Sequence, residues 1–166
     1  MNMEKVTFSI NYEVYHHLEE LPATDIQLLL AAKEVLKMAY APYSKFYVGA
    51  ALRLANDKIV TGNNQENASY PLGLCAERVA IFAAGAQYPN EPIEALAISI
   101  HSDLQMIDYP ICPCGGCRQV ISESEFRHQN DIRLIVQGEI GPIYVFNSVK
   151  DILPFTPKGS DIDTSV

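Results

Sequence analysis

Three thiols and one carboxylate, carried by two short motifs, are the residues of this sequence best suited to chemistry. The first motif is Cys-Ala-Glu at 75–77, and the second is Pro-Cys-Gly-Gly-Cys at 113–117. Thiolates are soft ligands that suit zinc, and a catalytic zinc site keeps three protein ligands and one open position for water. The two motifs therefore predict a zinc ion held by Cys75, Cys114 and Cys117, with Glu77 beside it.

Glu77 is assigned to proton transfer, because three thiols already complete the protein's share of the ligands. General acid/base help from such a carboxylate contributes roughly 10²–10⁴ in rate. Three thiolates and Zn²⁺ sum to a charge of about −1, which opposes the lowering of the pKa of bound water, so a compensating cation is expected. Arg78 follows Glu77 directly and is the first candidate, and Arg118, next to Cys117, is the second.

Cys112 is interpreted as a non-ligand, since it precedes Pro113 and lies outside the Cys-x-x-Cys spacing. A structural zinc site normally has four protein ligands, and Cys112 is the remaining thiol that would have to supply the fourth. Two alternatives stay open. One is a structural zinc site, or cysteines that are simply buried as small apolar residues. The other is a thioredoxin-like redox pair at Cys114 and Cys117. The redox pair would leave Glu77 without a role.

Both motifs stand where helices are expected to begin. The apolar spacing predicts one helix over 76–86, directly after Cys75, and another from Cys114 to about Phe126. A helix N-terminus lowers the pKa of a thiol, which favours the thiolate that a metal needs. Cys114 and Cys117 are three residues apart, so their sulfurs point to one side of the helix. Two helix N-termini are therefore expected to converge on one metal.

Strands and helices alternate along the rest of the 166 residues, of which 48% are hydrophobic and 19% charged, as in one globular domain. Apolar and polar residues alternate from 5 to 14 and predict a strand, and a helix is expected over about 24–39. Further strands are predicted at 48–54, 58–61, 95–100, 132–136 and 142–146, a polar loop at 62–73, and a short helix at 149–153. This order is typical of an α/β domain with helices on both faces of a sheet.

The composition limits the choice of partner. Twelve basic and 20 acidic residues give a formal net charge of −8, whereas nucleic-acid polymers require a basic surface. A small uncharged substrate is therefore favoured, and no nucleic-acid polymer is expected. Charges interrupt the N-terminus and no segment approaches the ~20 apolar residues of a membrane span, so neither a signal peptide nor a membrane contact is expected. We expect a cytoplasmic protein with reduced cysteines.

The motifs, taken together and in order, resemble the small homotetrameric cytidine deaminases of the cytidine and deoxycytidylate deaminase superfamily. The resemblance extends over roughly residues 24 to 155. Besides the zinc motifs it includes APYSKF at 41–46, VGAAL at 48–52, NQENASY at 64–70 and RQV at 118–120. It implies a three-layer α/β/α fold with a mixed five-stranded sheet, here with an extra N-terminal strand. The expected organisation is an N-terminal extension over 1–20, a catalytic domain over 21–157 and a tail over 158–166.

The resemblance implies a role for each matching residue. The three cysteines of the motifs match the ligands of one Zn²⁺ per chain, Glu77 matches the proton shuttle, and Arg78 matches the arginine that bonds the zinc thiolates. The substrate-binding residues of the family are matched by Phe46 against the pyrimidine, Asn64 and Glu66 at the ribose hydroxyls, and the Ala76 backbone at the base. The implied assembly is a homotetramer with active sites near subunit interfaces.

The function implied is the hydrolytic deamination of cytidine and 2′-deoxycytidine to uridine and 2′-deoxyuridine, with release of ammonia, in pyrimidine salvage. Cysteine at the first ligand position favours free nucleosides, since deaminases of nucleobases and transfer RNA usually have histidine there. Two alternatives remain. One is a deaminase of another cytosine-bearing small molecule such as blasticidin S, which the ribose motif at 64–66 disfavours. The other is a non-catalytic, zinc-stabilised interaction module.

Three positions depart from the family pattern. Tyr47 stands where relatives usually have proline, and the predicted strand over 5–14 precedes their first helix. In relatives an aromatic residue of the C-terminal segment reaches into a neighbouring subunit's active site. Phe155 lies two positions before that place, which Pro157 occupies.

Overall fold

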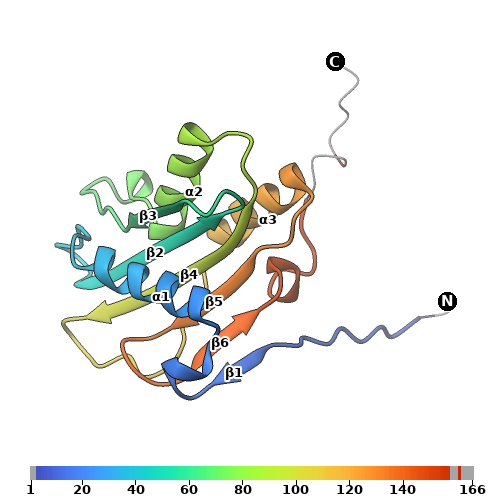
Figure 1. Ribbon diagram of the computed structural model, residues 1–166, viewed down its shortest axis with the longest axis horizontal. Coiled ribbons are helices and arrows are strands. Elements are labelled where there is room, and N and C mark those ends of the chain that lie inside the picture. Colours follow the sequence, from blue (N-terminus) through green and yellow to red (C-terminus); the bar gives the residue numbers. More distant parts are fainter. Residues whose placement is uncertain (1–2, 158–160, 162–166) are drawn as a thin grey trace.

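A six-stranded mixed sheet forms the centre of the protein in the computed structural model, which describes residues 3–157 and residue 161 (Figure 1). The strand order is β1-β6-β5-β4-β2-β3, and β4 and β5 are parallel whereas the other neighbours are antiparallel. The strands are β1 (Glu13–Tyr15), β2 (Phe46–Leu54), β3 (Ile59–Asn63), β4 (Ile93–Ser102), β5 (Arg133–Gln137) and β6 (Ile143–Phe146). The helices are α1 (Ala23–Leu36), α2 (Ala76–Gln87) and α3 (Gly115–His128), with short 3₁₀ turns η1 (Leu18–Glu20), η2 (Tyr70–Leu72) and η3 (Val149–Asp151).

The sheet has a helical layer on each face, as the sequence predicts. Side chains alternate along a strand, so neighbouring residues of β2 face opposite layers. Ala51 belongs to the core under α1, whereas Leu52 belongs to the core shared with α2 and α3. Figure 1 shows α1 on one side of the sheet and the other two helices on the opposite side. The three-layer α/β/α prediction is confirmed, with β1 as the extra N-terminal strand.

Two glycines let helices approach the sheet closely. A Cβ added at Gly49 would lie 2.0 Å from the carbonyl oxygen of Ala32 in α1. A Cβ added at Gly62 in β3 would lie 2.5 Å from the backbone nitrogen of Ala80 and 2.6 Å from the carbonyl oxygen of Ala76, both in α2. Real Cβ contacts are longer than this, so any other residue at Gly62 would push α2 away. Gly62 thus fixes where α2 begins, which matters because α2 carries the first zinc motif.

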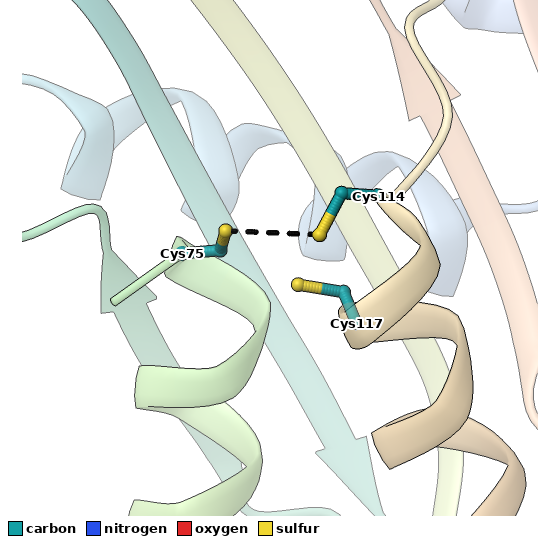
Figure 2. A group of neighbouring side chains, drawn as sticks. All are labelled: Cys75, Cys114 and Cys117. Carbon is teal, nitrogen blue, oxygen red and sulfur yellow. Dashed lines mark hydrogen bonds between the residues drawn. The ribbon is translucent and has the colours of Figure 1, made fainter. Parts of the chain in front are cut away.

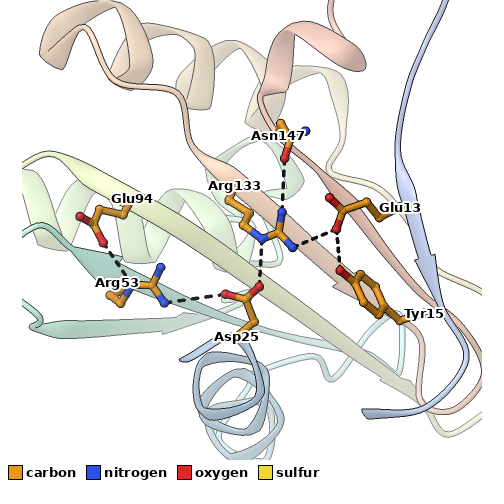
Figure 3. A network of polar contacts seen from close by, with 7 residues as sticks. All are labelled: Glu13, Tyr15, Asp25, Arg53, Glu94, Arg133 and Asn147. Carbon is orange, nitrogen blue, oxygen red and sulfur yellow. Dashed lines mark hydrogen bonds and ion pairs between the residues drawn. The ribbon is translucent and has the colours of Figure 1, made fainter. Parts of the chain in front are cut away.

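A network of charges centred on a buried carboxylate ties α1 and β1 to the sheet (Figure 3). Asp25 of α1 is 2% exposed, accepts a hydrogen bond of 2.9 Å from Nε of Arg133, and lies 3.8 Å from Nη1 of Arg53. Each arginine has a second carboxylate partner, Glu94 for Arg53 at 3.3 Å and Glu13 for Arg133 at 3.0 Å. Because Glu13 lies in β1, this network anchors the N-terminal strand to β5.

The N-terminal strand is shorter than its sequence pattern indicates. Alternation extends from 5 to 14, but pairing begins at Glu13, which opposes Val145 of β6. The strand β6 ends one residue later, at Phe146, so residues 3–11 have no neighbouring strand within the described chain. The predicted helix over 24–39 also ends early, at Leu36. Within residues 3–157 and 161, no helix is both long and apolar enough to cross a membrane.

Candidate active site

The three predicted zinc ligands meet between the N-termini of α2 and α3 (Figure 2). Cys75 is the residue before α2, Cys114 is the residue before α3, and Cys117 lies in the first turn of α3. The Sγ atoms of Cys75 and Cys114 are 4.0 Å apart, and all three sulfurs lie within 4.8 Å of one another. Sulfurs arranged around one zinc at about 2.3 Å would be roughly 3.8 Å apart. The cysteines are free thiols, so the donor set and its spacing fit a zinc ion.

The pKa values of Cys75 and Cys117 shift in opposite directions. A hydrogen bond with Cys117, together with bonds from Arg78 and Cys114, lowers the pKa of Cys75 to about 5, although burial opposes this change. The same bond with Cys75, and burial, raise the pKa of Cys117. The thiolate form is therefore favoured at Cys75 over Cys117. A bound metal would replace the thiol protons, since zinc is held by deprotonated sulfur.

The two arginine candidates occupy different positions. Nη2 of Arg78 is 3.7 Å from Sγ of Cys75, and this contact raises the pKa of Arg78. Arg118 instead donates to backbone carbonyls, from Nε to Pro113 at 2.7 Å and from Nη1 to Ile152 at 2.8 Å. The carbonyl of Pro113 immediately precedes Cys114. Arg78 is thus the arginine that faces a thiolate, and Arg118 holds the segment that leads into α3.

Glu77 lies in the first turn of α2 and is 5% exposed. Burial raises the pKa of its carboxyl, and the nearby negative charge of Cys75 acts in the same direction. Its place in the cavity wall puts the carboxyl within the same enclosure as Cys75 and Cys114. A carboxyl group that is shielded from bulk water, beside three sulfurs spaced to hold a metal, is suited to moving protons to and from a bound molecule.

A cavity of about 740 Å³ opens beside the sulfurs and is large enough for a nucleoside-sized molecule. Its wall brings together the predicted site residues that are far apart in the sequence: Phe46, Asn64, Glu66, Cys75, Glu77, Arg78 and Cys114. Ala76 and Cys117 are fully buried and lie behind the wall. Ala76, which is expected to contact the base, is thus not among the residues that line the cavity.

The two polar residues of the 64–66 motif are held differently. The Oδ1 atom of Asn64 accepts a hydrogen bond of 2.8 Å from the Val48 backbone, and its Nδ2 donates one of 2.9 Å to the carbonyl of Phe46. Oε2 of Glu66 accepts from the backbone nitrogens of Tyr43 at 2.9 Å and Ser44 at 3.3 Å. Asn64 therefore fixes the start of β2, where Phe46 lies, and Glu66 is held by the loop that precedes this strand.

The electrostatics of Glu66 support an ionised carboxylate. Burial would raise its pKa, but hydrogen bonds from Ser44 and from the Tyr43 backbone outweigh burial and hold the pKa below its ordinary value. An ionised carboxylate only accepts hydrogen bonds. The carboxylate of Glu66, which lines the cavity, is thus suited to a hydroxyl donor.

The sequence departures lie away from the sulfurs. Tyr47 donates a hydrogen bond of 2.9 Å to Asp103 and stacks on His101 with ring centroids 5.9 Å apart. It alternates with Phe46 along β2 and faces the other side of the sheet, outside the cavity. Phe155 is 87% exposed, and the carbonyl of Pro157 accepts a bond of 3.3 Å from Gln119 of α3.

Several cavity residues were not singled out from the sequence. The apolar wall includes Ile98 and Ile100 of β4 and Ile111, which an apolar pattern alone assigns to the core. Tyr43 and Tyr70 also line the cavity, with ring centroids 6.0 Å apart. Their signal was present, since each tyrosine lies within a loop that carries the family resemblance. Among the described residues, the group of thiols close enough to hold a metal leaves out Cys112, although Cys112 lines the cavity as well.

Comparison with known proteins agrees with this geometry. Residues 22–130 match the family model for the cytidine and deoxycytidylate deaminase zinc-binding region. A cytidine deaminase of Mycobacterium tuberculosis is 36% identical over 126 residues, which are 74% of this chain and 90% of the relative. One of Halalkalibacterium halodurans is 43% identical over 100 residues, 60% of this chain and 71% of the relative.

Solved structures give the same result. The crystal structure of a cytidine deaminase from Burkholderia pseudomallei superimposes with a TM-score of 0.69 and 39% identity, over 79% of this chain and 97% of that protein. The chain therefore belongs to the cytidine and deoxycytidylate deaminase family. The predicted enzyme class, a zinc-dependent cytidine deaminase and thus a hydrolase, is confirmed.

Proposed function

We propose that the protein hydrolyses cytidine and 2′-deoxycytidine to uridine and 2′-deoxyuridine and releases ammonia, as a step of pyrimidine salvage. The observation that carries the proposal is the meeting of three thiols within 4.8 Å at a cavity whose wall includes Cys75, Cys114 and Glu77. In the balanced reaction water adds its oxygen to C4 of the cytosine ring, and the exocyclic nitrogen leaves from the same carbon as ammonia.

Cys75, Cys114 and Cys117 are proposed to hold one Zn²⁺ per chain. When bound, zinc supplies a Lewis acid that lowers the pKa of water from about 15.7 toward 7, so that a nucleophile is available at neutral pH. Arg78 is proposed to offset the charge of the thiolates, because its guanidinium already contacts Sγ of Cys75.

Glu77 is proposed to move the protons that the reaction requires. The attacking water gives up both of its protons, one on attack and one when the carbonyl at C4 forms; the ring nitrogen N3 gains one of them, and the departing nitrogen gains the other before it leaves. One carboxyl group that faces the cavity from the first turn of α2 can serve each of these transfers in turn. Because Glu77 is almost fully buried, bulk water does not compete for its proton.

The remaining site residues are proposed to bind the nucleoside. Phe46 would contact the pyrimidine ring, and the carboxylate of Glu66 would accept a hydrogen bond from a ribose hydroxyl. Asn64 would donate its remaining Nδ2 hydrogen to the ribose, since its oxygen is already used by Val48. The Ala76 backbone would contact the base.

The assembly and setting are proposals as well. We propose a homotetramer with active sites near subunit interfaces, and large exposed apolar side chains beside the cavity, Tyr70 at 76% and Leu72 at 69%, support an interface there. A cytoplasmic location, no contact with nucleic-acid polymers or membranes, and a catalytic domain over 21–157 stay predictions. The tail over 158–166 lies outside the described residues, except for residue 161.

The substrate assay tests this function directly. The zinc-loaded protein is incubated separately with cytidine, 2′-deoxycytidine and blasticidin S, and loss of the amino group is followed by ultraviolet absorbance. We expect turnover of both nucleosides and none of the antibiotic. Turnover of blasticidin S alone would replace the proposed substrate, and no turnover of any of the three by a zinc-loaded sample would favour an interaction module.

A further inference from the structure

The N-terminal segment over residues 3–12, called the arm below, is extended and runs away from the body of the domain (Figure 1). Its apolar side chains occupy every second position and are largely exposed: Val6 at 83%, Phe8 at 52%, Ile10 at 49% and Tyr12 at 48%. The polar residues between them form the opposite face. The arm therefore has the surface of a strand with one apolar face, and it serves none of the site functions described above.

The arm is held to the domain at one end. Tyr12 packs against two rings of β6, with centroids 5.0 Å from Tyr144 and 5.4 Å from Phe146. Beyond Tyr12 the strand β6 has ended, so the backbone of residues 3–11 has no strand to pair with in the described chain. In addition, β1 is the end strand of the sheet, so no strand of the described chain pairs with its outer edge. Unpaired strand edges with apolar side chains are templates for pairing with another chain.

We propose that the arm pairs with the arm of a second copy of this chain as an antiparallel two-stranded ribbon, with its two-fold axis at Ser9. In antiparallel pairing, directly opposite residues share a face. The apolar side chains of the two arms therefore lie opposite each other only when the two-fold axis passes through a residue position, and not between two residues. Centring on Ser9 places Phe8 opposite Ile10 of the second copy and Val6 opposite its Tyr12. A two-fold axis makes each of these pairs occur twice.

Charge selects this register among those that keep the faces matched. With Ser9 at the centre, Lys5 lies opposite Glu13 of the second copy, on the polar face. With Phe8 at the centre, Lys5 would lie opposite the uncharged Asn11. Opposite-charge and apolar cross-strand pairs each contribute roughly 0.2–1 kcal/mol.

The same register joins the ribbon to both sheets. Lys5 of one copy reaches the outer edge of β1 of the other, where Glu13 begins the strand. Val6 of one copy then adjoins the ring cluster that Tyr12 forms with Tyr144 and Phe146 in the other. The ribbon is thus an extension of two existing sheets, and not an isolated two-stranded hairpin, which would be marginally stable.

Disulfide trapping in the full-length, zinc-loaded protein tests the pairing. Under mild oxidation, Ser9→Cys is expected to give a covalent dimer on a non-reducing denaturing gel, because its Cα lies opposite its own copy at about 5 Å, within disulfide range. In Thr7→Cys, the new cysteines of the two copies would be offset by four residues along the ribbon. Their sulfurs would be roughly 13 Å apart, beyond disulfide range. The double variant Thr7→Cys with Asn11→Cys restores opposite cysteines and is expected to crosslink.

Wild-type protein treated in the same way gives the background from the native cysteines. We expect at least tenfold more dimer from Ser9→Cys than from Thr7→Cys, and loss of that excess when Ile10→Asp is added. No dimer above background, or equal dimer from both single variants, overturns the proposal. The arm does not line the cavity, so cytidine turnover should be unchanged in all of these variants, and the outcome is independent of the proposed function.

Discussion

Removing the Asp25 carboxylate is expected to destabilise the fold strongly, because this one side chain neutralises two arginines in the charge network (Figure 3). Breaking a buried ion pair by removing one partner costs about 3–5 kcal/mol, since the other charge is left uncompensated. Arg133 would keep Glu13, and Arg53 would keep Glu94, which places the expected loss near the lower end of that range. We therefore predict that Asp25→Ala loses about 3 kcal/mol of unfolding free energy.

The assay is urea unfolding followed by circular dichroism, at one protein concentration because association between copies would add to the apparent stability. For a chain of this length, a loss of about 3 kcal/mol corresponds to a melting temperature roughly 6–12 °C lower. Asp25→Asn fills the same volume without the charge, so it should lose more than half as much unfolding free energy as Asp25→Ala. Glu34→Ala is the matched control, because Glu34 pairs with Lys37 on the exposed face of the same helix.

The control should change the unfolding free energy by at most about 0.5 kcal/mol, as exposed helix pairs do. If Asp25→Ala cost less than about 1 kcal/mol, or no more than the control, the network would not hold α1 and β1 to the sheet. A large loss in Asp25→Ala together with a wild-type value for Asp25→Asn would assign the effect to packing rather than to charge.

Three further predictions concern the supports of the site and the pH dependence of stability. Gly62→Ala should move the first turn of α2 and lower both zinc retention and cytidine turnover, whereas Gly85→Ala, whose added Cβ meets nothing within 4 Å, should keep both and raise the melting temperature. Arg118→Gln should release zinc to a chelator several-fold faster, because the Pro113 carbonyl loses the guanidinium that donates to it. The control Arg127→Gln loses a hydrogen bond to the Pro89 carbonyl and should release zinc at the wild-type rate. Hydrogen bonding to Glu139 raises the pKa of His101. The free energy of unfolding that protonated His101 contributes is therefore full below about pH 6.5 and is lost as pH rises through the folded-state pKa. The melting temperature of His101→Gln should therefore lie further below wild type at about pH 5.5 than at about pH 8.5, and the opposite trend would contradict this assignment.

The position of Cys75 and Cys114 at helix N-termini could be predicted because local sequence determines where a helix begins. Cys75 and Cys114 stand at the residues where apolar periodicity begins, and a helix start both places a thiol and lowers its pKa. The structure places the three sulfurs within 4.8 Å, as the prediction requires. The layers of the fold were predictable for the same reason, since alternation along β2 divides its residues between two cores.

Features that depend on distant segments could not be predicted in this way. The alternating pattern over 5–14 indicates a strand, but its paired length is set by where β6 ends, at Phe146. Arg118 adjoins the second motif, as a residue that balances the thiolate charge would. Its guanidinium nevertheless donates hydrogen bonds to the carbonyls of Pro113 and Ile152. The direction of the Arg118 side chain determines its role, and its position next to the motif in the sequence does not specify that direction.

The measurement that tests the central claim most directly is cytidine turnover by zinc-loaded Glu77→Gln, compared with wild type at equal bound zinc. The substitution keeps the size of the side chain and removes its capacity to carry protons, while the three sulfurs stay in place. We predict one zinc per chain in both proteins and a turnover at least about 10²-fold lower in the variant, the lower bound for general acid/base catalysis. Turnover near the wild-type value, with zinc retained, would contradict the assignment of Glu77 and with it the proposed mechanism.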